Sequence, residues 1–471
     1  MLFILAVLAA VVCGIAADNA PTQVHIALAG MDISTGNSNK MAASWNTDGQ
    51  TPTSTVKYGS ASTVYDTVVT GTSSAYYETY NHHVVFDTLS PAKTYYYIVG
   101  DDVNGWSKEF SFKSAPLSSE LRGNFSFLVY GDMGVVNGDP TRAYINANKD
   151  SVELVWHAGD VGYADDSFLH KGCVTKFCYE ETFDSYMEDV EPWASQLPYM
   201  VTPGNHEADC HDPACLLDSE RREKLSNFTA YNGRFRMPSE ETGGVLNMHY
   251  SFNYGNVHFI SLDTETGYPG AAEETRYVLP CGGFGDQLTW LENDLIKANA
   301  DRELRPWILA AGHHPMYNGK SINADFQTAM EGLFYKYGVD VYFAGHVHSY
   351  ERDLPVYQGV PEADYDLPLA TTHLLIGGAG NDEMRHIQLD HSTDPAPHEG
   401  PGQSKWFESD EDGPWTVTTD KDDHVGIGKV IIHDDSTLTF EYIRTITGEV
   451  FDSFTLTRDH SRYLKTQIKT A

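Results

Sequence analysis

Several short apolar runs in the second part of the chain end in glycine and then in a residue with an oxygen or nitrogen donor. Each run has the length of a buried strand, roughly four to eight residues, and a turn signal follows it. Ligand sites in open α/β sheets lie at the carboxyl ends of strands, so these donor sets are expected to converge. The runs and the motifs after them are FSFLVY (125–130) with GDMG, VELVWH (152–157) with GDVGYAD, LPYMVT (197–202) with GNHE, PWILAA (306–311) with GHHP, and VYFA (341–344) with GHVHSYER.

Helical patterns lie between some of these runs. Leu288, Leu291 and Leu295 share one face, and residues 325–338 are amphipathic. Buried strands that alternate with helices predict an α/β fold with sheets of βαβαβ type and helices packed against them. Later apolar runs from residue 366 to 460 are expected to complete the sheets of the domain that begins at residue 122 and extends to residue 365.

Residues 20–116 have a different rhythm, with short alternating runs separated by Gly, Ser and Asp. Helical periodicity does not interrupt them, and the pattern predicts a β-sandwich that resembles a fibronectin type III domain. The segment SAPLSSE (114–120) is the expected linker to the α/β part.

The first residues favour a secretory route. Residues 1–17 form an apolar run that ends in small residues, which is typical of a signal peptide. Asn124 and Asn227 begin acceptor sequons for N-glycosylation, which carry meaning in a secreted chain. We therefore expect a secreted or extracellular protein, or one in a vacuolar or lysosomal compartment, without a membrane span after signal cleavage.

The cysteines leave more than one interpretation. Besides Cys13 in the leader, the chain has two close pairs, each of which could close a small loop or contribute to a zinc cluster, and one further thiol. An oxidising compartment favours disulfides. If the close pairs are bridged, Cys281 is expected outside both bridges. The pairs are Cys173 with Cys178 and Cys210 with Cys215.

The formal net charge of −35 argues against nucleic acid as a partner. It would also repel an anionic substrate, unless a strong positive charge is concentrated at the site. The oligomeric state stays open.

Each motif alone has an ordinary structural explanation. Gly-Asp after a strand is often a turn, and a single histidine often satisfies a core hydrogen bond. His346 and His348, however, lie on one face of a strand end because side chains alternate with period two. The joint occurrence of all the motifs favours a metal site.

The motifs in this order resemble those of the calcineurin-like metallophosphoesterases, and Tyr163 after Asp160 narrows the resemblance to the purple acid phosphatases of the large plant and fungal type. The resemblance implies that Asp132, Tyr163 and His348 bind one metal ion. It implies that Asn205, His313 and His346 bind the other ion, with Asp160 bridging the two.

The resemblance further implies one Fe(III) and one divalent ion, Zn, Fe or Mn, in each subunit. The implied activity is hydrolysis of phosphate monoesters by metal-bound hydroxide, with His206 stabilising or protonating the leaving group. A phosphodiesterase or phytase preference is the alternative within the enzymes. A non-catalytic cell-surface binding protein is the alternative outside them.

Other residues near the motifs have weaker predicted roles. His157 and Asp165 are expected to orient ligands, and Glu351 with Arg352 is expected to form an ion pair that anchors the histidine loop. The family's further pair of histidines after GHHP is missing, and Lys320 and Asn323 stand near those places as candidate phosphate contacts. His314 has no assigned role, and the loop 267–286 is expected to border the cleft.

Overall fold

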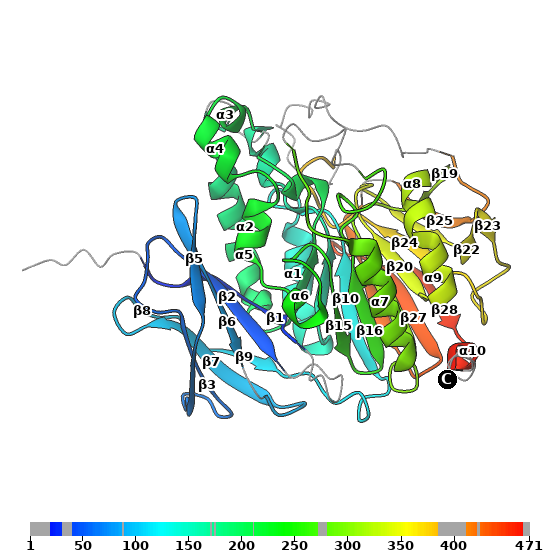
Figure 1. Cartoon of the computed structure of the whole chain (residues 1–471), viewed down its shortest axis with the longest axis horizontal. Helices are drawn as coiled ribbons and strands as arrows, with labels where there is room; N and C mark the ends of the chain where they lie inside the picture. The colour runs from blue at the N-terminus through cyan, green and yellow to red at the C-terminus, as the bar shows by residue number, and fades with distance from the viewer. Residues whose placement is uncertain are drawn as a thin grey trace, which may run out of the picture.

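The computed structural model describes residues 19–30, 40–86, 89–169, 172–173, 176–210, 212–271, 280–384, 411–421 and 424–464. The predicted signal peptide at 1–17 lies outside these residues, as does the middle of the predicted cleft loop 267–286. The N-terminal strands lie beside one edge of a larger body, in which helices cover the outer faces of two sheets (Figure 1).

The N-terminal part is a sandwich of two antiparallel sheets, as predicted. Its core buries Trp45, Phe86 and Tyr97, and the rings of Phe86 and Tyr97 meet edge to face at 5.4 Å. One sheet has the order β1 (Thr22–Leu28), β2 (Met41–Thr47), β6 (Thr79–Phe86), β5 (Thr72–Tyr76). The other has the order β4 (Thr67–Thr70), β3 (Thr55–Gly59), β7 (Thr94–Asp101), β8 (Gly105–Trp106), with β9 (Phe110–Lys113) also on β7.

The larger part contains two mixed sheets. The six-stranded sheet runs β14 (Tyr199–Thr202), β12 (Val155–Ala158), β10 (Phe125–Tyr130), β26 (Gly426–Ile432), β27 (Thr437–Arg444), β28 (Glu449–Thr457). The seven-stranded sheet runs β15 (Tyr250–Tyr254), β16 (Val257–Ser261), β17 (Trp307–Ala311), β20 (Val341–Ala344), β24 (Thr372–Ile376), β21 (Tyr350–Asp353), β25 (Thr416–Asp420). Short strand pairs are β11 (Met133–Gly134) with β13 (Val161–Gly162), β18 (Tyr317–Asn318) with β19 (Ser321–Ile322), and β22 (Val356–Tyr357) with β23 (Val360–Pro361).

The two sheets pack face to face through aromatic side chains. Trp156 on β12 meets Phe259 on β16 with ring centroids 5.4 Å apart, and both side chains are buried. Phe343 on β20 meets Phe440 on β27 at 6.3 Å. Strands that are buried on both faces explain why their sequences are continuous apolar runs rather than alternating ones.

Helices cover the outer faces of this sheet pair. The α2 helix packs against the six-stranded sheet through Tyr186, whose hydroxyl lies 2.8 Å from that of Tyr199 on β14. The α7 helix packs against the other sheet through Asp294, which accepts a hydrogen bond from Ser251 on β15. The helices are α1 (Asp139–Asn148), α2 (Tyr179–Ala194), α3 (Pro213–Leu216), α4 (Ser219–Lys224), α5 (Thr229–Arg234), α6 (Ser239–Thr242), α7 (Gln287–Ala300), α8 (Ala324–Phe326), α9 (Gly332–Tyr337) and α10 (Ser461–Leu464).

The predicted fold class, a β-sandwich followed by an α/β sandwich flanked by helices, is confirmed. The helix expected over 325–338 is broken into α8, a π-helical turn at Gln327–Glu331 and α9. None of the described helices has both the length and the apolar character needed to cross a membrane.

Of the two interpretations of the close cysteine pairs, the structure bears out the disulfides. Cys173 is bonded to Cys178, and Cys210 is bonded to Cys215. Cys281 belongs to neither bridge, as predicted, and its Sγ lies 3.6 Å from the carbonyl oxygen of Ala208.

Candidate metal centre

The carboxyl ends of β10, β12, β14, β17 and β20 bring the predicted donors together. Strands β10, β12 and β14 are parallel to one another, and so are β17 and β20, so that each sheet delivers its loops to one edge. Many of the donors come from a backbone in the left-handed region, which is costly for residues other than glycine and concentrates at functional sites. These residues are Asp132 (φ 64°), Asp160 (57°), Tyr163 (52°) and His346 (71°).

The glycine before a donor permits the close approach of the loops. A Cβ atom on Gly204 would lie 2.3 Å from Oδ1 of Asp160, and one on Gly345 would lie 2.3 Å from Oδ2 of Asp132. Any larger residue at either position would displace a carboxylate of the site. The Gly-donor pattern in the sequence therefore reflects packing around the site.

The first donor group surrounds the phenolic oxygen of Tyr163. This oxygen lies 3.1 Å from Oδ1 of Asp132, 3.2 Å from Oδ2 of Asp160 and 3.1 Å from Nε2 of His348. Burial, followed by the charges of Asp132 and Asp160, raises the pKa of Tyr163 well above 10. A bound cation would reverse this preference and favour the phenolate.

The second donor group shares Asp160 with the first. Nε2 of His313 lies 2.9 Å from Oδ2 of Asp160 and 3.0 Å from Oδ1 of Asn205. The same Asn205 oxygen lies 2.8 Å from Nδ1 of His346. Oδ2 of Asp160 is therefore close to donor atoms of both groups, at 3.2 Å from the Tyr163 oxygen and 2.9 Å from Nε2 of His313. A carboxylate that bridges two metal ions needs such a position.

The donor chemistry fits two cations. Two sets of side chains share Asp160, and within each set the ligand atoms lie within 4.8 Å of one another. One set is Asp160, His313 and His346, and the other is Asp132, Asp160 and His348. In the described ion pairs, histidines alone face the Asp132 and Asp160 carboxylates. Buried carboxylates need a compensating charge. Imidazole nitrogens and the oxygens of phenolate and carboxylate groups are ligands suited to iron and zinc.

His206 lies beside the shared aspartate with its ring held by Asp165. Nδ1 of His206 is 3.0 and 2.9 Å from the two carboxylate oxygens of Asp165, and its ring centroid is 4.2 Å from that of Tyr163. Burial lowers the pKa of His206, but the charges of Asp165 and Asp160 outweigh it and raise that pKa well above 6.5. Nε2 of the same ring lies 3.8 Å from Oδ2 of Asp160. Asp165 thus holds His206, which is not among the predicted metal ligands, so the predicted role of Asp165 in orienting ligands stays a prediction.

Several supporting residues were not found from the sequence. The carboxylate of Glu207 accepts hydrogen bonds from the backbone N–H groups of Gly204, Asp160 and Val161, at 2.7, 2.9 and 2.7 Å. The hydroxyl oxygen of Thr264 accepts from the N–H groups of both His313 and His314, at 2.9 Å each. Glu207 is the last residue of the GNHE motif, so the motif could have drawn attention to it, whereas no motif contains Thr264.

The ring nitrogens of two candidate ligand histidines that point away from the donor groups also have partners. Nδ1 of His313 lies 3.0 Å from the carbonyl oxygen of Ala158, and Nδ1 of His348 lies 3.6 Å from a carboxylate oxygen of Glu383. Such contacts fix the orientation of a ligand imidazole.

His314, which had no predicted role, packs against a candidate ligand. Its ring lies 4.0 Å from that of His346, centroid to centroid, and its Nε2 lies 3.0 Å from the carboxylate of Glu265. Both His314 and Glu265 are buried. The structure thus gives His314 a place behind the second donor group.

His157 is buried beneath the site rather than among the donors. Its Nδ1 lies 2.7 Å from the hydroxyl of Tyr199 and 3.3 Å from that of Tyr186. Burial lowers its pKa to about 3, so the ring is neutral. Its predicted role in orienting ligands stays a prediction.

The predicted ion pair of Glu351 with Arg352 is wrong. Adjacent residues on β21 point to opposite faces of the sheet. Arg352 instead binds Asp452 through Nε at 2.7 Å and Nη2 at 3.0 Å, while Glu351 accepts from the N–H of Gly319 at 2.8 Å.

The weak candidates for phosphate contact have other partners. Lys320 forms an ion pair with Glu411 at 2.6 Å, and the side chain of Asn323 caps α8 by accepting from the N–H of Phe326. Of the sequon residues, Asn124 is exposed, and Asn227 is half-buried with its Oδ1 accepting from the N–H of Gly282. These assignments stay predictions.

Three family models match consecutive parts of the chain. They describe the purple acid phosphatase N-terminal domain (residues 21–114), the calcineurin-like phosphoesterase (125–350) and the iron/zinc purple acid phosphatase-like protein C (370–453).

Curated relatives and solved structures agree with these matches. The chain is 32% identical to acid phosphatase A of Cryphonectria parasitica, over 95% of this chain and 94% of that protein. It is 35% identical to probable purple acid phosphatase 20 of Arabidopsis thaliana, over 72% and 70%. A purple acid phosphatase from yellow lupin seeds shares the fold with a TM-score of 0.68, at 22% identity, over 95% of this chain and 76% of that one.

Proposed function

Because the chain belongs to the purple acid phosphatase family, we propose that it is a secreted acid phosphatase that hydrolyses phosphate monoesters at a binuclear metal centre. The observation that carries the proposal is the convergence of two donor groups on Oδ2 of Asp160, which lies 3.2 Å from the Tyr163 oxygen and 2.9 Å from Nε2 of His313.

The chemical difference between the two donor groups supports a different ion for each. Asp132, Tyr163 and His348 include a phenolate donor, which is hard and anionic and favours Fe(III). Asn205, His313 and His346 suit a divalent ion, Zn, Fe or Mn, and Asp160 would be a ligand of both ions. When bound, the ions supply Lewis acidity that orients the phosphate and activates the attacking water at acidic pH.

The chain itself supplies the group that acts on the leaving oxygen. Asp165 holds Nδ1 of His206, so Nε2 is directed toward the donor groups and is the atom that protonates or stabilises the departing alkoxide. A positioned general acid contributes roughly 10²–10⁴-fold to the rate. Glu207 and Thr264 hold the backbone beneath the donors, so their role is positioning.

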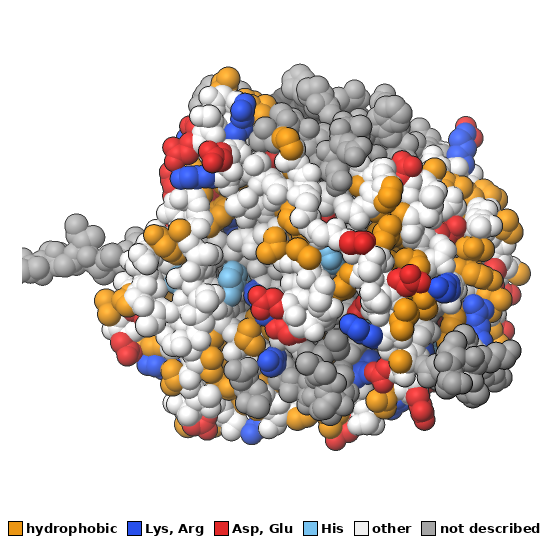
Figure 2. Space-filling model, in the orientation of Figure 1, with side chains coloured by type: hydrophobic (Ala, Val, Ile, Leu, Met, Phe, Trp, Pro, Cys, Tyr) orange, Lys and Arg blue, Asp and Glu red, His pale blue; other side chains and the backbone are white. Residues whose placement is uncertain are grey.

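An anionic substrate must approach a chain with a formal net charge of −35. On the face drawn in Figure 2, acidic side chains are spread among basic ones, and the described residues there show no continuous basic patch. The positive charge that bound metal ions would supply at the centre can attract the phosphate locally. Protonation of surface carboxylates at acidic pH lessens the repulsion, and the optimum is expected at about pH 4–6.

Purified protein that contains its metals tests the proposal. We expect iron and a divalent ion in equal amounts, and turnover of p-nitrophenyl phosphate well above that of its bis ester or of phytate. Higher turnover of the bis ester or of phytate would instead indicate a phosphodiesterase or a phytase. If the protein as purified contains no metal and hydrolyses no phosphate ester, the proposal is contradicted.

The role of His206 has its own test. His206→Ala should reduce kcat for an alkyl phosphate about 100-fold, and much less for p-nitrophenyl phosphate, whose leaving group departs without a proton. An equal loss on both substrates would contradict leaving-group protonation.

A further inference from the structure

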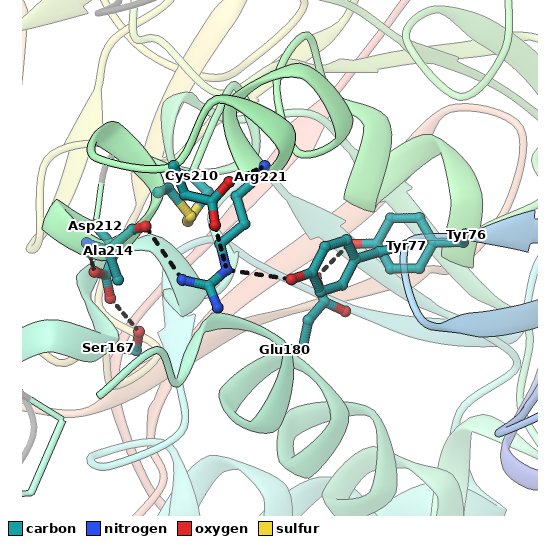
Figure 3. Close-up of a disulfide and its surroundings, with 10 residues drawn as sticks. Tyr76, Tyr77, Ser167, Glu180, Cys210, Asp212, Ala214 and Arg221 are labelled. Carbon is teal, nitrogen blue, oxygen red and sulfur yellow. Dashed lines mark hydrogen bonds and ion pairs between the residues drawn. A yellow bond between two sulfur atoms is a disulfide. The ribbon is translucent and has the colours of Figure 1, made fainter.

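The segment that the Cys210–Cys215 disulfide closes begins shortly after His206 in the chain. Asp212 lies inside this segment and is buried. One of its carboxylate oxygens caps α3 by accepting from the N–H of Ala214 at 2.6 Å. The other accepts a hydrogen bond from the hydroxyl of Ser167 at 3.3 Å (Figure 3).

Ser167 belongs to the same short 3₁₀ helix as the partner of His206. This helix, η2, spans Ala164–Leu169, and both Asp165 and Ser167 are fully buried in it. Asp165 binds His206, and Ser167 binds Asp212, so two residues of η2 are hydrogen-bonded to the stretch of chain from His206 to Asp212. These two contacts and the chain that joins their residues form a closed loop, and Asp212 lies in the segment that the Cys210–Cys215 disulfide closes.

The N-terminal sandwich reaches the same segment. Tyr77 lies in the turn between β5 and β6, and its hydroxyl oxygen accepts from Nε of Arg221 at 3.2 Å. Nη1 of Arg221 donates to the carbonyl oxygen of Ala214 at 3.3 Å, and the guanidinium lies 4.1 Å from the ring centroid of Phe177. Figure 3 shows Arg221 between Tyr77 and the disulfide segment.

The neighbouring tyrosine adds a second anchor for this hairpin. The hydroxyl of Tyr76 donates to Glu180 on α2 at 2.6 Å, and the second Glu180 oxygen accepts from Arg234 at 2.8 Å. The turn that carries Tyr77 is thus fixed to the catalytic part independently of Arg221. A fixed turn can hold Arg221 in place.

We propose that the disulfide segment positions the His206 side chain through Asp212 and Ser167, and that the N-terminal sandwich holds this segment through Tyr77 and Arg221. The inference rests on the proposed role of His206 as the leaving-group proton donor. It makes the sandwich part of the architecture of the active site rather than an appended module.

Leaving-group dependence separates positioning of His206 from a general structural role. The readout is the ratio of kcat for p-nitrophenyl phosphate to kcat for glycerol 2-phosphate, whose alkoxide needs a proton. We expect Ser167→Ala to raise this ratio about fivefold, the equivalent of one ordinary hydrogen bond. Tyr77→Phe should raise the ratio about twofold, because the Tyr77–Arg221 hydrogen bond acts on His206 only through the disulfide segment and is partly exposed.

Matched variants control for the loss of stability. Ser251→Ala removes another buried serine-to-aspartate hydrogen bond, from β15 to α7. Tyr65→Phe removes a tyrosine-to-glutamate bond within the sandwich. Both should leave the kcat ratio unchanged, and thermal unfolding of all variants confirms that they are folded.

The outcomes distinguish the inference from its premise. If His206→Ala changes both substrates equally, the proton-donor role is wrong and the inference falls with it. If His206→Ala raises the ratio but Ser167→Ala behaves like Ser251→Ala, the inference alone is overturned. If Tyr77→Phe behaves like Tyr65→Phe, the part assigned to the sandwich is overturned.

Discussion

Replacing Tyr163 with phenylalanine removes a single oxygen from the middle of the first donor group. The side chain is fully buried, and its ring packs against that of His206 with centroids 4.2 Å apart. Phenylalanine preserves this ring contact and leaves no large cavity. The change therefore tests the oxygen, which lies about 3 Å from donor atoms of Asp132, Asp160 and His348.

The two states of the protein should respond differently to Tyr163→Phe. In the metal-free protein the phenol donates one hydrogen bond, so the free energy of unfolding should fall by only about 1 kcal/mol. In the loaded protein that we propose, the phenolate would be one of about three anionic ligands, so its loss should weaken iron binding and abolish the visible charge-transfer band. Because the buried phenol must lose its proton to bind the ion, the native protein should release about one more proton on loading than the variant.

Visible spectra, iron content and calorimetry in two buffers of different ionisation enthalpy measure these effects at about pH 5.5. Tyr250→Phe is the matched control, because its buried hydroxyl donates to a backbone carbonyl at 2.7 Å, away from the donors. It should keep the colour and the proton release. A Tyr163→Phe protein with an unchanged band and unchanged proton release would refute the assignment of Tyr163 as a ligand.

Other side chains give further predictions. Glu265→Gln should weaken the hold on His314 behind the second donor group and reduce activity and retention of the divalent ion about 10-fold, measured by kinetics and elemental analysis. Burial, and then the charge of Glu351, raises the pKa of Asp353 well above 3.8. The protonated Asp353 side chain therefore contributes its full stability below about pH 4, and this contribution is lost as pH rises from there toward the raised pKa of the folded state. Asp353→Asn should flatten that fall in the free energy of unfolding, measured by urea unfolding at a series of pH values above about pH 4. Arg234→Met should cost about 3–5 kcal/mol in the same assay, because two carboxylates of α2 lose their buried partner.

The donors were predictable because each follows directly after a strand. Strand length and apolar character are local properties, and the carboxyl ends of parallel strands share one edge. Asp132, Asp160 and His346 could therefore be placed together without a structure. Their left-handed backbone could not, because only the surrounding loops impose it.

The supporting residues were mostly beyond reach of the sequence. Glu265 and Glu383 lie in loops, and their histidine partners are fixed by packing between segments far apart in the chain. Arg352 finds Asp452 about a hundred residues later, which periodicity does not indicate. The incorrect pairing of Arg352 with Glu351 was avoidable, because the alternation of side chains along a strand already places adjacent residues on opposite faces.

The docking of the sandwich on the catalytic part also depends on contacts between distant segments that the sequence does not indicate. The pattern of residues 20–116 predicted a sandwich but gave no reason for it to dock. In the structure, imidazole nitrogens of His25 and His83 lie 3.1 Å from the carbonyl oxygens of Arg234 and Gly233, respectively, in α5. These carbonyls belong to the last turn of a short helix and have no further helical turn to bond them. Histidines in strands of the sandwich thus satisfy backbone acceptors at the end of α5. Docking therefore depends partly on backbone hydrogen bonds between the two parts, which the hydrophobic pattern of either part alone does not indicate.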